Sequence, residues 1–191
     1  KWGMYTNAVT GGDFILAYAA ASGSYASVFE AQTDLSVDFK GVVTKVKQPC
    51  FSVTRNGTQN NVTGNGTAYV PTLVSEIFDQ GADFNISNYQ FTAPVAGRYL
   101  LSGQMNISGI TSAADQATIY IVTSNRTYQN NYIYTNTIGT SIILNATMVA
   151  DMDANDVAYL QVYGSGEASD VWDLVSTLAS PGTWFSGSLI A

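Results

Sequence analysis

The sequence carries its strongest structural signal in Tyr89-Gln90-Phe91-Thr92-Ala93-Pro94-Val95-Ala96-Gly97-Arg98-Tyr99. Pro94 cannot donate a hydrogen bond to a β-ladder, so it belongs at the start or the edge of a strand. Gly97 suits a turn that leads into Tyr99. From Tyr99 onward the side chains alternate with a period of two, which is typical of a half-buried strand. One face carries Tyr99, Leu101, Gly103, Met105 and Ile107, and the other carries Ser102, Gln104 and Asn106.

Short strands separated by turns continue through the rest of the chain. Turn signals such as Gly11-Gly12, Asn56-Gly57 and Pro181-Gly182 recur at short intervals, with β-branched and aromatic runs between them. Ser141–Met148 alternates like the strand after Tyr99. Asp156–Tyr163 has apolar residues on both faces, which suggests a strand sandwiched between the core and another chain. This spacing predicts an all-β sandwich or barrel.

From Lys47 onward the chain resembles the C1q-like globular head. The similar segments occur in the family's order: Gln48–Arg55, Tyr89–Tyr99, Ser141–Met148, Asn155–Gly164 and Phe185–Ile190. The resemblance implies a jelly-roll β-sandwich of the C1q and tumour-necrosis-factor (TNF) type over residues 47–191, assembled as a homotrimer. It also implies that the matching residues build the sandwich interior and the threefold contact instead of binding ligand. These residues are Phe51, Phe91, Pro94, Gly97, Tyr99, Tyr159, Leu160, Phe185 and Gly187.

Residues 1–46 predict a separate small β-rich module. Gly11–Ala17, Tyr25–Glu30 and Leu35–Gly41 have the composition of short strands, but they offer too few apolar positions to fold alone. We place the boundary with the head at 46–48. Trp2-Gly3, Gly11–Ile15 and Leu35–Val43 resemble the shaft or neck repeat of phage tail fibres. That resemblance implies a fibre neck in front of a trimeric knob.

Charge and residue content exclude several classes of function. Charged residues make up 11% of the chain and the net charge is −7, so clustered cations for nucleic acid or anionic lipid are missing. No apolar run reaches the length of a membrane span. The absence of histidine excludes Ser-His-Asp and Cys-His catalysis. A carboxylate-based glycosidase stays chemically open, but no pair of acids has visibly divergent environments. We therefore expect a non-enzymatic protein without a cofactor.

Two features bear on metal and thiol chemistry. Some C1q-like proteins hold calcium through Asp residues before the later aliphatic strand, whereas Thr127–Thr140 contains no carboxylate. Asp151-x-Asp153-x-Asn155 imitates the start of a calcium loop, but Asp156 stands where that loop needs glycine. We predict a solvated turn there and no metal. Cys50 is the single cysteine, and we interpret it as a small buried hydrophobe.

Ligand contacts are expected on exposed segments that combine aromatic rings with amides or carboxylates. Tyrosine and tryptophan offer flat apolar faces with a polar edge, and amides and carboxylates can bond vicinal hydroxyls. The alternative for the second segment is a loop that Trp172 anchors by packing. The candidate residues are Tyr128, Asn130, Asn131, Tyr132 and Tyr134 in one segment, and Asp170, Trp172 and Asp173 in the other.

These features lead to two functional hypotheses. The first is the trimeric receptor-binding head of a viral tail fibre, located on the virion, joined to the rest of the fibre and attached to a host-surface receptor expected to be a glycan. The second is an extracellular or bacterial-surface trimer of the same fold, for example in a spore coat, with a structural role. Collagen-like flanking sequence would favour the second hypothesis, and fibre repeats favour the first.

Overall fold

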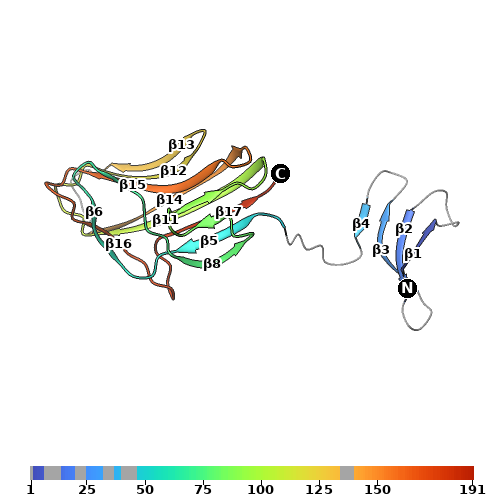
Figure 1. Cartoon of the computed structure of the whole chain (residues 1–191). Helices are drawn as coiled ribbons and strands as arrows, with labels where there is room; N and C mark the ends of the chain where they lie inside the picture. The colour runs from blue at the N-terminus through green and yellow to red at the C-terminus, as the bar shows by residue number, and fades with distance from the viewer. Residues whose placement is uncertain (1, 7–13, 20–24, 32–36, 40–46, 134–139) are drawn as a thin grey trace. The chain divides into compact units, whose positions relative to one another are not determined.

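The computed structural model describes residues 2–6, 14–19, 25–31, 37–39, 47–133 and 140–191. The sequence-based expectations for residues 11–13, 40–41 and Tyr134 lie outside these ranges. The chain divides into two compact units, Lys1–Val46 and Lys47–Ala191, which we call the neck and the head and describe separately (Figure 1). The described residues form strands joined by turns and loops, with no helix among them. Accordingly, the described residues include no helix that could cross a membrane.

The neck is an antiparallel sheet in the order β1-β2-β3-β4. The strands are β1 (Trp2–Thr6), β2 (Phe14–Ala19), β3 (Tyr25–Ala31) and β4 (Val37–Phe39). The last three strands lie where the sequence predicts them. The first strand was not predicted, although its Trp, Tyr and Thr residues favour extended backbone.

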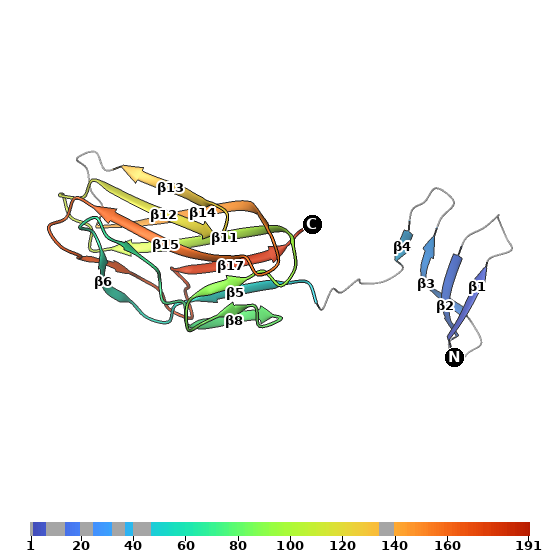
Figure 2. The same ribbon diagram turned by 45° about the horizontal axis from the view of Figure 1, so that its top comes forward.

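The head is a sandwich of two antiparallel sheets that lie face to face (Figures 1 and 2). In the first, the β12 sheet, the order is β13-β12-β15-β10-β9, and β7 also pairs with β15. Its strands are β13 (Thr127–Ile133), β12 (Gln116–Thr123), β15 (Val157–Ser165), β10 (Gln90–Thr92), β9 (Phe84–Asn85) and β7 (Ala68–Tyr69).

The second sheet, the β11 sheet, has the order β6-β16-β11-β17-β5-β8, and β14 pairs along β11. Its strands are β6 (Gln59–Thr63), β16 (Trp172–Leu174), β11 (Gly97–Ser108), β17 (Trp184–Leu189), β5 (Cys50–Thr54), β8 (Ser75–Gln80) and β14 (Ser141–Met152). The β11–β14 ladder runs from Gly97 opposite Met152 to Ser108 opposite Ser141. The predicted alternation is confirmed, because Tyr99, Leu101, Gly103, Met105 and Ile107 are all buried.

A cluster of aromatic rings fills one part of the core. The ring of Phe51 stacks on Phe91 at 4.6 Å between centroids and meets Phe185 edge-on at 5.1 Å. Tyr99 is fully buried, and its hydroxyl donates to the carbonyl of Val95 over 2.8 Å. Burial raises the pKa of the Tyr99 phenol despite that bond. Aromatic side chains dominate cores in this way because each removes a large apolar area from water.

Three residues that the resemblance assigns to the scaffold, Pro94, Gly97 and Tyr159, lie outside the buried core. Pro94 lies exposed in the bend after β10, outside the ladder. Gly97 is the first residue of β11, and a Cβ there would lie 2.6 Å from the carbonyl oxygen of Ala191. Position 97 therefore requires glycine because the backbone of Ala191 passes close to it. Leu160 is buried, but Tyr159 points to the outward face of the β12 sheet and is half-buried.

Cys50 corrects another expectation. Its side chain is half-buried instead of buried in the core, since it is the neighbouring Phe51 that points inward. Its Sγ lies 3.8 Å from the Gln80 side-chain oxygen.

Candidate binding surfaces

The first candidate segment forms the edge strand β13 of the β12 sheet. Tyr128, Asn130 and Tyr132 pair with Ile121, Ile119 and Ala117, all of which are buried. These three side chains therefore lie on the inward side of the sheet, where its edge approaches β14.

The inward position limits what this segment offers to a ligand. Tyr128 is half-buried and packs against the core. The side-chain amide of Asn130 donates to the backbone oxygen of Asn145 over 2.8 Å and so links β13 to β14. Asn131 is exposed on the outward side, and Tyr132 is 49% exposed. Of the segment's described candidates, Asn130, Asn131 and Tyr132 are exposed, and the Asn130 amide is already bonded to β14.

The second candidate segment contains a clear correction, because Trp172 is fully buried in β16. The indole packs so closely on Gly164 that a Cβ there would lie 2.2 Å from the ring. The expectation that this ring faces a ligand is wrong, and the anchoring alternative is right. The flanking carboxylates have protein partners. Asp170 accepts from the Thr67 hydroxyl, and Asp173 accepts from the backbone N–H of Asn61, each at 2.9 Å. Among the described strands, β13 and β16 belong to different sheets and do not pair with each other.

Glu167 organises the loops around Trp172, a role that no local sequence pattern predicts. Its Oε1 accepts from the Trp172 indole at 3.1 Å and from the Thr111 backbone amide at 2.9 Å. Its Oε2 accepts from the Thr111 hydroxyl at 2.7 Å. Burial alone would raise the pKa of this carboxyl, but the hydrogen bonds from Thr111 and Trp172 prevail and the pKa is lowered.

Residues 153–156 form the turn between β14 and β15, as predicted, whereas Asp151 belongs to strand β14. Asp156 Oδ2 accepts from the backbone amide of Asp153 at 2.9 Å and from the side chain of Asn125 at 2.6 Å. Asn155 adopts the left-handed conformation, with φ of 73°. Across the described ranges, no three His, Cys, Asp or Glu side chains are grouped as a metal site would require.

The outward face of the β11 sheet, which we call the β11 face, exposes large apolar side chains, and Arg98 lies opposite Asp151 at one end of it. Leu100, Ile143 and Val149 are 39%, 55% and 50% exposed. The outward positions between them carry only neutral polar residues, and the hydroxyls of Ser102 and Thr147 lie 2.7 Å apart across the ladder. The sequence held a signal for this face, because Leu100 and Ile143 break the polar half of each alternating pattern.

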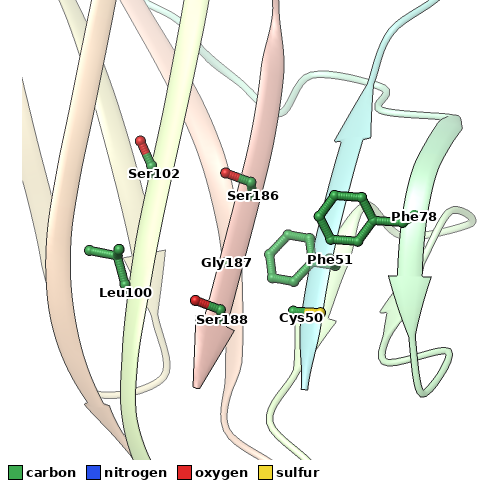
Figure 3. Close-up of a pocket in the computed structure, with 8 residues that line it drawn as sticks. All are labelled: Cys50, Phe51, Phe78, Leu100, Ser102, Ser186, Gly187 and Ser188. Atoms are coloured by element: carbon green, nitrogen blue, oxygen red, sulfur yellow. The ribbon is translucent and has the colours of Figure 1, made fainter. Parts of the chain in front are cut away.

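An open hollow of about 220 Å³ lies on the β11 face (Figure 3). Phe78, which is 51% exposed, stands beside it on β8, and Leu100 borders it on β11. Gly187 leaves no room for a side chain, because a Cβ there would lie 2.7 Å from the ring of Phe51. Gly187 and Phe51 both line the hollow. The remaining lining residues are Cys50, Ser102, Ser186 and Ser188.

Comparison with known proteins identifies the fold of the head. No protein-family model matches the chain, and no curated protein does. Among solved structures, the globular domain of zebrafish complement 1qA is similar with a TM-score of 0.53 and 17% identity, covering 75% of this chain and 98% of that one. The crystal structure of murine APRIL is similar with a TM-score of 0.50 and 10% identity, covering 75% of this chain and all of that one, 100%. The head therefore has the jelly-roll fold of the C1q- and TNF-like globular domains, as the sequence predicts.

Proposed function

We propose that this protein is a homotrimeric, non-enzymatic binding head that assembles through the β11 face and attaches a viral tail fibre to a saccharide on a cell surface. The observation that carries the proposal is the partly apolar β11 face. Leu100 and Val149 are both exposed and lie opposite each other, and exposed apolar surface of this kind marks interaction sites. The sequence resemblance to C1q-like heads independently implies threefold assembly.

The chemistry of the β11 face suits contact between identical chains. Leu100, Ile143 and Val149 each retain roughly half of their surface exposed, and full burial of such a side chain contributes about 1.5–3 kcal/mol. The polar groups between them are hydroxyls and amides, and the charged residues Arg98 and Asp151 stand opposite each other at the end of the ladder. Burying unpaired charges would cost several kcal/mol each. The hollow beside Phe78 offers space for an apolar side chain of a neighbouring subunit.

The attachment role is supported by composition and by the neck. A chain with net charge −7 and no histidine is poorly suited to nucleic acid, to anionic lipid and to most hydrolytic chemistry. The neck resembles fibre repeats, which favours a fibre over a coat protein. Three equivalent sites on one head would raise weak saccharide affinity through avidity.

Sedimentation equilibrium of the full chain tests the assembly. The expected mass is about three times the 20.3 kDa of one chain. Leu100→Arg and Val149→Arg place a cation in the contact, and each should yield a folded monomer. Ile86→Arg is the matched control, because Ile86 is 43% exposed and lies in the turn after β9. A wild-type monomer at micromolar concentration would contradict the proposal.

Cell binding tests the attachment. Fluorescently labelled wild-type protein is incubated with a panel of bacterial strains, before and after periodate oxidation of their surface sugars. We expect binding to particular strains, loss of that binding after oxidation, and at least tenfold weaker binding by the monomeric Leu100→Arg variant. Equal binding to intact and oxidised cells would rule out a saccharide receptor.

A further inference from the structure

The outward face of the β12 sheet, which we call the β12 face, carries a group of tyrosines. Ala158, Leu160 and Val162 point into the core, so Tyr159, Gln161 and Tyr163 point outward from β15. On β12, Ile119 and Ile121 are buried, so Tyr120 points outward as well. All three tyrosines are half-buried, as expected for rings that lie along a sheet.

The strand register places these side chains together. Tyr120 stands opposite Gln161 of β15 and opposite Gln129 of β13. Tyr159 and Tyr163 flank Gln161 at two residues on either side, so each lies diagonal to Tyr120 at about 7–8 Å. Along β15 the two are separated by four residues, or about 13 Å. The three rings thus surround one central amide, with Asn131 beside them opposite Thr118.

The β12 face is free of charge. None of the strands β7, β9, β10, β12, β13 and β15 contains a charged residue. Within the described part of the chain, the hydroxyls of Tyr120, Tyr159 and Tyr163 also take part in no hydrogen bond. The face therefore combines flat apolar rings with free hydroxyl and amide groups.

We infer that the β12 face, centred on Tyr120, Tyr159, Tyr163 and Gln161, binds a neutral saccharide. Tyrosine rings can pack on the C–H faces of sugar rings at low entropic cost, while hydroxyls and amides bond the sugar hydroxyls. A phosphate or carboxylate sugar would find no cation here, and a cationic sugar would find no anion. The inference rests on the proposed function and identifies the class of its ligand and the surface that holds it.

A second copy of the chain is the competing occupant, because β15 carries apolar groups outward too. The two faces differ in exposure. Leu100, Ile143 and Val149 on the β11 face are 39–55% exposed, whereas the tyrosines of the β12 face are already half-covered by their neighbours. Subunit association through the β11 face would remove more exposed apolar surface from water than association through the β12 face. The β12 face is thereby left open to ligand.

The probe for this site is an array of neutral oligosaccharides (glucans, galactans and mannans) printed beside sialylated and phosphorylated ones. We expect the wild-type trimer to bind a neutral member. Its Kd should rise at least tenfold in Tyr120→Thr and Tyr159→Thr, which keep strand propensity but lose the ring. Tyr120→Phe should cost less than fivefold, because stacking is kept. Ile86→Thr is the control, an exposed apolar residue in the turn after β9 that lies outside every candidate ligand site.

Other outcomes overturn the inference. Binding only to charged sugars, binding to none of the sugars, or an equal loss of binding in Ile86→Thr would each do so. Dissociation of the trimer by Tyr120→Thr would show that this face is the subunit contact. If a tyrosine variant fails to fold, Gln161→Thr takes its place, with at least fivefold weaker binding expected and unchanged binding contradicting the site. If the wild-type trimer attaches to cells and the tyrosine variants bind equally well, this site alone is refuted. If the wild-type protein is a monomer and attaches to no cell, the proposed function is refuted.

Discussion

The indole Nε1 of Trp172 donates a hydrogen bond to Oε1 of Glu167 over 3.1 Å. The bond connects the largest fully buried side chain of the head to a half-buried carboxylate in the loop after β15. The same carboxylate accepts twice from Thr111. Packing of the indole and placement of the loops at this end of the sandwich are thus coupled through one residue.

Glu167→Gln should lower the free energy of unfolding by about 1 kcal/mol, because the amide that replaces Oε2 cannot accept the Thr111 hydroxyl. Urea denaturation followed by fluorescence measures the change. Asp170→Asn is the matched control, since it also removes one negative charge but affects a single bond from Thr67. We expect it to cost less than about 0.5 kcal/mol. Equal effects in the two variants would contradict the central role of Glu167.

The contribution of Glu167 should depend on pH. Its pKa is lowered in the folded protein, so its stabilisation is fully present above the unfolded pKa and is lost as the pH falls through the folded value. Wild type and Glu167→Gln should therefore differ most near neutral pH and converge in acid. Urea melts at a series of pH values measure the difference. A gap that widened towards low pH would reverse the sign and contradict the assignment.

Gly164→Ala should destabilise the head by about 3 kcal/mol, because its Cβ would lie 2.2 Å from the buried indole of Trp172. Gly103→Ala is the comparison. There the Cβ would lie 2.6 Å from a terminal methyl of Leu160, which can move more easily than a ring. We expect Gly103→Ala to lower the free energy of unfolding about half as much as Gly164→Ala, and thermal melts measure the difference. Adding Trp172→Leu to Gly164→Ala should recover part of the loss, and strict additivity of the two changes would argue against the clash.

Much of the head fold was readable from the sequence because its long strands each have one buried face. In β11 every second residue from Tyr99 to Ile107 is buried, and the inward residues of β14 are buried or half-buried. The alternation of Leu101, Met105 and Ile107 against polar neighbours therefore defined the strand and its inward face. Sequence similarity to C1q-like heads then supplied the order of the strands, which periodicity alone does not determine.

The binding surfaces were less predictable, because they depend on contacts between segments that are distant in sequence. Trp172 is buried since Gly164 leaves room for its ring, a pairing that no local pattern shows. The side-chain amide of Asn130 donates a hydrogen bond to the Asn145 carbonyl of β14, which lies near it only because the sandwich closes there. Tyr159 was grouped with the scaffold by resemblance, although its position between buried Ala158 and Leu160 places it outward.

Asp83→Asn should stabilise the head slightly at neutral pH, by about 0.3 kcal/mol given the solvent exposure of the site. Burial and the neighbouring charge of Asp79 raise the pKa of the Asp83 carboxyl, so its ionised form is disfavoured in the fold. The penalty applies above the folded pKa and vanishes once the group is protonated in acid. Paired melts at neutral and acidic pH measure it. If Asp83→Asn were less stable than wild type at neutral pH, the charge of Asp83 would instead stabilise the fold.

Asn130→Asp should loosen the closure between β13 and β14. The aspartate has no amide proton to donate to the Asn145 carbonyl, and its charge would face that oxygen across the 2.8 Å that the bond now spans. We expect a loss of about 1 kcal/mol in urea denaturation, together with faster hydrogen exchange of the β13 amides. Asn131→Asp introduces the same charge one residue further along, where the side chain is exposed on the outward side. It should change stability by less than about 0.5 kcal/mol. The closure depends on Asn130 only if the first variant loses stability and protection that the second keeps, and equal behaviour of the two would assign the junction to backbone packing instead.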